Sequence, residues 1–212
     1  MKKMKPGRIK GLYALTPDET HTERLLAQVE VALAAGVKML QYRNKLADPR
    51  LRAMQAQALL PLCRAHDATF IINDDIKLCL AIDADGVHLG KTDGSLAAAR
   101  TRLGPDKLLG ASCYDHFDNA IAAKAHGADY VAFGACFVSG TKPDAPRADL
   151  GLFSRAQAEL GLPAVAIGGI TVDNAGQAIT AGADAIAVIG ALWNSADIPL
   201  TIERFQRAIS QP

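Results

Sequence analysis

A short apolar run followed by an amphipathic, Ala-rich stretch repeats eight times along the chain, and this repeat limits the folds open to it. We interpret the apolar runs as strands: Gly11–Leu15, Lys38–Tyr42, Thr69–Ile72, Gly86–Leu89, Leu108–Ala111, Tyr130–Phe133, Ala164–Ile167 and Ala185–Ile189. The stretches between them, such as Thr22–Ala35, Leu51–Ala65 and Phe117–Ala125, have helical periodicity. Strands joined through helices run parallel, with right-handed crossovers. Eight units predict a closed (β/α)₈ TIM barrel, whereas five or six would form an open doubly wound sheet.

Glycines at the junctions between helix and strand support the same interpretation. Gly36, Gly127 and Gly182 stand where a helix would end in a left-handed residue, and an apolar run soon follows each of them. No linker, low-complexity segment or change in composition divides the 212 residues. We therefore expect a single α/β domain, a (β/α)₈ TIM barrel spanning residues 1–212. An open sheet is the alternative, because short strands are easily misassigned.

Composition and charge exclude several kinds of partner. Half of the residues are hydrophobic and the formal net charge is +1, so no basic field favours nucleic acid. No stretch is long and apolar enough to cross a membrane, and the run after Lys10 is too short for a signal peptide. The four cysteines lack disulfide or metal-ligand spacing and fit reduced thiols. We expect a cytoplasmic protein with no nucleic-acid or membrane partner; a homo-oligomer stays open.

Charged side chains follow the strands, where barrel enzymes place their active sites. Arg43, Lys45 and Lys142 come after the second and sixth apolar runs and suit phosphate oxygens. Asp74 and Asp93 come after the third and fourth runs. A Mg²⁺ site commonly uses one or two carboxylates together with substrate phosphates. Cations and acids on one face therefore predict a diphosphate–Mg²⁺ ligand.

A second anion site is predicted after the last two strands. Gly168 and Gly169 follow the seventh run and Gly190 follows the eighth, and glycines there let backbone N–H groups approach a phosphate. Thr171 would begin the next helix as its N-cap. Two phosphate sites on one face suggest a transfer between two small phosphorylated substrates.

Seven short motifs run in series from Gln41 to Leu192: QYRNK, IIND, GVHLGKTD, GASCYD, DYVAFGACFVSGTK, AIGGIT and AVIGAL. In order and approximate spacing they resemble the motifs of the thiamine-phosphate synthase (thiamine-phosphate pyrophosphorylase) family. No single motif is specific, since IGGI and GADxxxV occur in many phosphate-binding barrels. The series QxRxK, ND, GVHLGxxD and TK is a strong signal.

The resemblance implies a role for each matching residue. Hydroxymethylpyrimidine diphosphate would be held by Gln41, Tyr42, Arg43, Asn44, Lys45, Asn73, Ser112 and Lys142. The catalytic residues among them would be Arg43, Lys45, Ser112 and Lys142. The Mg²⁺ ligands would be Asp74 and Asp93. The thiazole ring or its carboxylate would contact Ser139, Gly140 and Thr141, and its phosphate would contact Gly169, Ile189 and Gly190.

The resemblance also implies the reaction: diphosphate leaves the pyrimidine substrate, the thiazole nitrogen attacks, and thiamine phosphate forms. One rival is a thiazole tautomerase of the sister branch, which needs a proton-shuttling base; we expect His88 to pack or hydrogen-bond instead. A sugar-phosphate isomerase or epimerase would explain the glycines but not the paired carboxylates. A non-catalytic thiamine-precursor-binding regulator, which kept the barrel and lost turnover, is a further alternative.

Structural roles compete with these assignments at several positions. Asp93 could begin a helix as its N-cap, Asn73 and Asp74 could form only an Asx turn, and Ser112 could cap the fifth helix. Asp75 is expected to be solvated.

Five positions depart from the commonest family pattern: Asn44, Lys91, Tyr114, Ser139 and Gly190. Gly190 stands where Ser is common, so a side-chain hydroxyl to the thiazole phosphate is missing there. Backbone N–H groups could still serve, so the departures bear on affinity more than on chemistry.

Overall fold

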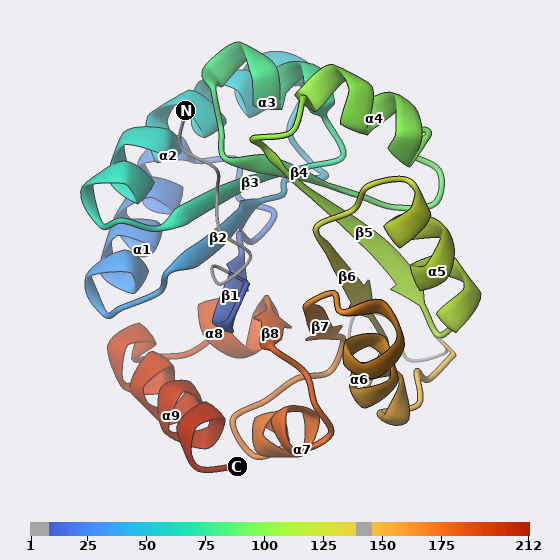
Figure 1. The fold of residues 1–212 in the computed structure, drawn as a ribbon. Helices are drawn as coiled ribbons and strands as arrows, with labels where there is room; N and C mark the ends of the chain where they lie inside the picture. The colour runs from blue at the N-terminus through green and yellow to red at the C-terminus, as the bar shows by residue number, and fades with distance from the viewer. Residues whose placement is uncertain (1–8, 139–145) are drawn as a thin grey trace.

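The structure, a computed structural model, describes residues 9–138 and 146–212. Eight parallel strands form one closed barrel in sequence order, and Figure 1 shows them enclosed by the helices. The strands are β1 (Gly11–Leu15), β2 (Met39–Tyr42), β3 (Thr69–Asn73), β4 (Gly86–Leu89), β5 (Leu108–Tyr114), β6 (Tyr130–Phe133), β7 (Ala164–Ile167) and β8 (Ala185–Val188). The predicted (β/α)₈ barrel is confirmed.

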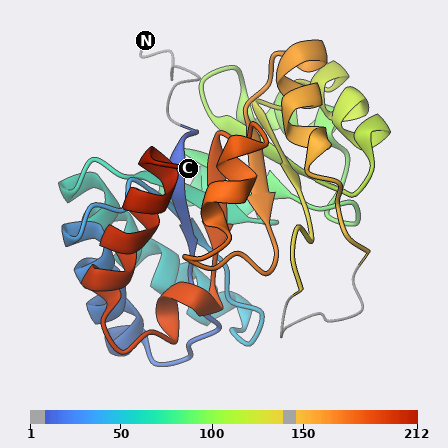
Figure 2. The same ribbon diagram turned by 90° about the horizontal axis from the view of Figure 1, so that it is seen from below.

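Helices follow the strands on the outside of the barrel. They are α1 (Thr22–Ala34), α2 (Pro49–Ala65), α3 (Ile76–Ile82), α4 (Leu96–Leu103), α5 (Phe117–Ala125), α6 (Gly151–Arg155) continued by the π-helical η2 (Ala156–Leu160), α7 (Ala175–Thr180), α8 (Gly190–Trp193) and α9 (Ile198–Ser210). The last helix, α9, packs against β1 and α1, as Figure 2 shows from the side. The beginning and the end of the described chain therefore meet.

Closure of the barrel depends on β1, which pairs on both sides. Tyr13 lies opposite Met39 of β2, and Leu12 lies opposite Ile186 of β8. A closed barrel has no unpaired edge. The open doubly wound sheet, left as an alternative by the sequence, is therefore wrong.

Apolar side chains form two cores because successive residues of a strand point to opposite faces. Along β3, Phe70 and Ile72 belong to the core between strands and helices, whereas Ile71 belongs to the core inside the barrel. Tyr13 and Tyr130 are the largest side chains of the inner core, and both are fully buried. Their hydroxyls need hydrogen-bond partners there.

Capping residues fix where several helices begin. The carboxylates of Asp48, Asp75 and Asp197 and the hydroxyl of Ser95 each accept a hydrogen bond from a backbone N–H of the first turn. Positive φ angles at Gly36, Gly127 and Gly182 confirm the predicted left-handed helix ends.

Three local expectations were wrong. Thr171 does not begin a helix: α7 starts at Ala175, and the Asn174 side chain accepts from the Thr171 N–H at 2.8 Å. Asp75 is not simply solvated, because its carboxylate caps α3. Strand β5 runs on past Ala111 to Tyr114, since Ser112 and Tyr114 still pair with β6. Of the other strands, β2, β3 and β8 differ from the prediction by one residue at one end, and the remaining four agree.

Within the described residues, no helix combines the length and the apolar character that a membrane crossing requires.

Candidate active site

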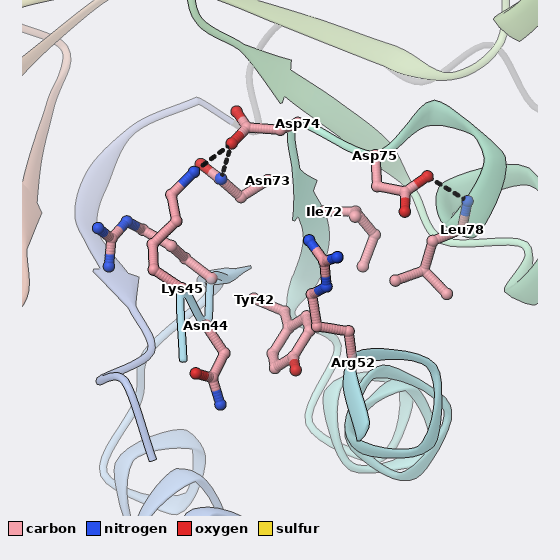
Figure 3. Close-up of a pocket in the computed structure, with 10 residues that line it drawn as sticks. Tyr42, Asn44, Lys45, Arg52, Ile72, Asn73, Asp74, Asp75 and Leu78 are labelled. Atoms are coloured by element: carbon pink, nitrogen blue, oxygen red, sulfur yellow. Dashed lines mark hydrogen bonds and ion pairs between the residues drawn. The ribbon is translucent and has the colours of Figure 1, made fainter. Parts of the chain in front are cut away.

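A cluster of opposite charges lies where β2, β3 and β4 end. The Nζ of Lys45 is 2.6 Å from Oδ2 of Asp74, and the amide of Asn73 donates to the same oxygen at 2.5 Å. Figure 3 shows both contacts converging on Asp74. The sequence separates Lys45 from Asp74 by a whole helix, so only the neighbouring strands bring them together. The predicted meeting of a cation and an acid at this face is present.

Asp74 is held in an uncommon backbone conformation. Its φ is 64°, in the left-handed region, where a residue other than glycine stores some strain. Its N–H donates to the carbonyl of His88 on β4 at 2.9 Å, and the next N–H, that of Asp75, donates to the Asn73 carbonyl. The turn is therefore fixed by β4 as well as by local bonds. Strain at such a position is typical of a functional site.

Asp93 stands near Asp74 and does not begin a helix. Its Oδ2 accepts from the Gly90 N–H at 2.8 Å, and Ser95 is the residue that caps α4. Burial and the neighbouring Asp74 carboxyl raise the pKa of Asp93, because both disfavour its charged form. A divalent cation between two such carboxylates would relieve their repulsion. The described residues contain no group of three or more acids, histidines or cysteines that could ligate a metal alone.

Arg43 is oriented by a residue that sequence reasoning missed. Its guanidinium donates to both carboxylate oxygens of Asp18, at 3.0 and 3.1 Å, and Asp18 also accepts from the Lys45 N–H at 2.7 Å. Asp18 lies in the loop after β1, which ends at Leu15, and that position after a strand was a usable signal. Asp18 therefore holds the QxRxK segment in place.

Two residues of that segment have structural partners. The Tyr42 hydroxyl donates to the buried Gln55, and the Asn44 amide donates to Gln55 and to the Glu19 carbonyl. The Asn44 oxygen accepts from the N–H groups of Leu46 and Ala47. In Figure 3 the Asn44 amide points away from Lys45 and Asp74. Roles for the Tyr42 and Asn44 side chains in binding the pyrimidine substrate stay predictions.

Arg52 is a second residue that the sequence did not single out. It comes from α2 and lines a cleft of about 320 Å³ together with Asp74, Asp75, Asp93 and three further residues. Figure 3 shows its guanidinium above Tyr42, directed toward the loop after β3. Its Nε is buried without a hydrogen-bond partner in the described part of the chain. In the sequence, Arg52 was indicated only as a further cation soon after QYRNK, in a stretch that contains other arginines.

Gln41 and Ser112 lie on opposite sides of the barrel mouth. Gln41 donates to Tyr13, and Ser112 bonds to Nε2 of His88. Ser112 does not cap α5, which begins after His116 without a side-chain cap. As expected, His88 is buried and hydrogen-bonded, and burial lowers its pKa to about 4.

The glycines after β7 and β8 differ in what surrounds them. A Cβ on Gly169, where φ is +69°, would lie 2.5 Å from the carbonyl oxygens of Phe137 and Val138. Gly168 is similarly tight against Ala135. These two glycines therefore serve the close packing of the β6–α6 and β7–α7 loops, whatever they bind. Among residues 9–138 and 146–212, a Cβ on Gly190 would meet only the Asn194 amide, at 3.3 Å, so these residues leave space open there.

Ile189 directly follows β8 and precedes the first residue of α8, Gly190, so both lie at the mouth of the barrel. Ser139, Gly140, Thr141 and Lys142 lie outside the described residues. Their roles stay predictions.

A closed parallel barrel with cations and carboxylates at the carboxyl ends of its strands defines the class of protein: a TIM-barrel enzyme. The particular family follows from comparison. The family model described as thiamine monophosphate synthase matches residues 12–192. The chain belongs to this family, and it is a transferase of thiamine biosynthesis.

Named relatives agree over nearly the whole chain. The thiamine-phosphate synthase of Methylobacillus flagellatus is 60% identical over 94% of this chain and 95% of its own length. That of Chromobacterium violaceum is 58% identical over 91% and 92%. The solved thiamine phosphate pyrophosphorylase of Pyrococcus furiosus is 32% identical, with a TM-score of 0.85 over 97% of this chain and 98% of that one.

Proposed function

We propose that the chain joins 4-amino-2-methyl-5-hydroxymethylpyrimidine diphosphate to a thiazole phosphate, releasing thiamine phosphate and diphosphate. The observation that carries the proposal is the cluster of Lys45, Asp74 and Asp93 at the ends of three neighbouring strands, with Arg43 beside it. Such a mixture of cations and hard oxygen ligands suits a diphosphate more than a monophosphate.

The diphosphate would be held by Arg43, Lys45, Asn73 and Ser112, with Lys142 contributing as the sequence predicts. The Lys45 side chain is half exposed, which leaves donors available to a ligand while it is paired with Asp74. Arg43 is held in one orientation by Asp18, which pairs with one of its guanidinium nitrogens and leaves the other donors for a ligand. Cations fixed in advance stabilise charge without reorganising during the reaction.

Mg²⁺ is the metal that we propose for Asp74 and Asp93. Two neighbouring carboxylates, one with a raised pKa, fit a divalent cation that also binds substrate phosphate oxygens. When bound, the ion would offset negative charge on the diphosphate. Binding and orienting the diphosphate would remain the task of the protein side chains.

The thiazole phosphate would bind at the other side of the mouth. Backbone N–H groups at Gly169, Ile189 and Gly190 would receive the phosphate, and Ser139, Gly140 and Thr141 would line the ring or a carboxylate on it. Open space at Gly190 supports this placement, because a ligand can approach the backbone there.

The chemistry would be an alkyl transfer. The C–O bond between the pyrimidine methylene and diphosphate breaks, with both electrons leaving on oxygen, and the thiazole nitrogen then forms the new C–N bond. The aminopyrimidine delocalises the positive charge on its methylene, so no protein nucleophile is required. Arg43, Lys45 and Lys142 would stabilise the departing diphosphate.

A tautomerase is less well supported, because it needs a base that exchanges protons with the substrate. His88 is buried and bonded at both ring nitrogens. The four cysteines are buried, and burial raises the pKa of each thiol. None of these groups offers an accessible base.

The test is incubation of the purified protein with both substrates and Mg²⁺, followed by chromatographic assay for thiamine phosphate and diphosphate. We expect equal amounts of the two products, none with either substrate alone, and loss of both after EDTA treatment. Turnover that survives EDTA would contradict the metal assignment. Tight binding of the substrates without product would favour the alternative of a non-catalytic regulator that binds thiamine precursors.

We also propose that residues 1–212 form one domain and that the protein works in the cytoplasm. The closed barrel and the contact of α9 with β1 support a single unit. The four buried, unpaired cysteines fit a reducing compartment.

A further inference from the structure

Five polar side chains form a continuous chain of hydrogen bonds through the inside of the barrel. The Gln41 amide lies 2.7 Å from the Tyr13 hydroxyl, and the Tyr13 and Tyr130 hydroxyls are 3.0 Å apart. The Tyr130 hydroxyl is 3.1 Å from Nδ1 of His88, whose Nε2 is 2.9 Å from the Ser112 hydroxyl. Each residue comes from a different strand, and the two ends of the chain are residues proposed to bind the pyrimidine substrate.

This hydrogen-bond chain lies in the core of the barrel. Gln41, Tyr13, Tyr130 and His88 are all at least nine-tenths buried. Gly110 on β5 makes room for its central bond: a Cβ there would lie 2.4 Å from the Tyr130 hydroxyl and 2.5 Å from Nδ1 of His88. Buried polar groups are costly unless they are satisfied, so a chain with every member paired also specifies one arrangement.

Counting protons gives the chain a direction. The Gln41 amide nitrogen can only donate, so the Tyr13 oxygen accepts this bond. A buried hydroxyl proton needs an acceptor, and the Tyr130 oxygen is the acceptor within reach, so Tyr13 donates to Tyr130. The Tyr130 hydroxyl then donates a hydrogen bond to Nδ1 of His88. A neutral imidazole carries one proton, which is therefore on Nε2 and is donated to Ser112. The Ser112 hydroxyl keeps its own proton free for the barrel mouth.

We infer that Tyr13, Tyr130 and His88 are positioning residues that turn the hydroxyl proton of Ser112 toward an acceptor atom of the pyrimidine diphosphate. The inference rests on the proposed function for the identity of that substrate. Ser112 contacts the substrate, and the other three act through it. If these hydrogen bonds ran in the opposite direction, the Ser112 hydroxyl would donate to His88. Ser112 would then present only an acceptor oxygen to the substrate.

The direction can be measured without turnover. Nitrogen-15 spectra of the protein labelled at histidine separate a protonated ring nitrogen from an unprotonated one. We expect His88 to carry its proton on Nε2 in the wild-type protein, and Tyr130→Phe to give a mixture of the two tautomers. A wild-type His88 protonated on Nδ1 would overturn the inference, whether or not the protein makes thiamine phosphate.

The kinetic test is a double-mutant cycle between Tyr130→Phe and Ser112→Ala. Tyr130→Phe alone should lower kcat/KM for the pyrimidine diphosphate on the order of tenfold, about the worth of one misdirected hydrogen bond. In the Ser112→Ala background the same change should cost less than about twofold, because its effect passes through Ser112. An equal loss in both backgrounds would mean that Tyr130 has only a packing role.

A matched control is Thr69→Val, which removes a buried hydroxyl at the start of β3 that takes no part in this hydrogen-bond chain. It should leave kcat/KM unchanged. If Tyr130→Phe is too unstable to assay, Tyr13→Phe interrupts the same chain one bond earlier and should behave in the cycle in the same way.

Discussion

At the scale of single residues, the cations of the site differ in what holds them. Arg43 is fixed by the Asp18 carboxylate and Lys45 by Asp74. Arg52 points into the same region from α2, and its buried Nε has no partner in the described part of the chain. A cation that is positioned but not satisfied is suited to an anionic ligand.

Arg52→Gln should therefore raise KM for the pyrimidine diphosphate by roughly ten- to a hundredfold, the range for a lost hydrogen bond to a charged group. Steady-state kinetics with each substrate varied in turn checks this. KM for the thiazole phosphate should change little, because Gly190 lies after β8, away from α2. Arg207→Gln on the exposed face of α9 is the control. An unchanged KM for both substrates would mean that Arg52 does not bind substrate.

Gly190 allows the opposite kind of experiment, in which a contact is added. The family commonly has Ser here, and of the residues that the structure describes a Cβ at Gly190 would touch only the tip of the Asn194 side chain. Gly190→Ser should lower KM for the thiazole phosphate by about two- to tenfold through a new hydroxyl donor. Gly190→Ala supplies the Cβ without the hydroxyl and should not lower KM. Equal behaviour of the two variants would place the phosphate elsewhere.

At the scale of elements, neighbouring residues of the β3–α3 loop divide two tasks. Asp74 takes part in the charge cluster, whereas Asp75 caps α3 by accepting from the Leu78 N–H at 2.9 Å. Helix α3 is only seven residues long, so it depends on its cap and its packing more than on its own propensity.

Asp75→Ala should destabilise the protein by about 1 kcal/mol, the usual worth of an N-cap, and lower Tm by roughly 2–4 °C. Asp75→Asn keeps a capping oxygen and should stay within experimental error of the wild type. Thermal unfolding followed by circular dichroism measures both. A full loss of stability in the Asn variant would show that the charge of Asp75, and not its cap, matters.

At the scale of the whole molecule, β1 joins the two halves of the chain. It pairs with β2 and β8, and the only tryptophan, Trp193 in α8, donates to the Leu15 carbonyl at the end of β1. The fluorescence of Trp193 therefore reports on barrel closure, whereas circular dichroism reports on all helices.

If residues 1–212 form one domain, the two signals should change together in urea, with one midpoint and one slope. The expected cause is that no half of a closed barrel can bury its inner core alone. A fluorescence midpoint clearly below that of circular dichroism would mean that the barrel opens before it unfolds, and that the halves are separate folding units.

The barrel and much of the site follow from the amino-acid sequence alone. Alternation of strand and helix is a local pattern, and residues that follow parallel strands must share one face, so Lys45, Asp74 and Asp93 could be placed together without coordinates. The family motifs added the substrate assignments. Local turn chemistry was less certain: Thr171 looked like a cap and Asp75 looked solvated, and both depended on where the helix began.

Which partner each polar group takes depends on the packing of the whole barrel. Asp18 reaches Arg43, and Tyr13 reaches Tyr130 across more than a hundred residues, because closing the barrel brings β1 beside β2 and β8 and points alternate side chains into one interior. No pattern in the sequence fixes such pairs, since the bond depends on strand register and on space such as that left by Gly110. Buried polar groups must find partners, and the fold, not the local sequence, supplies them.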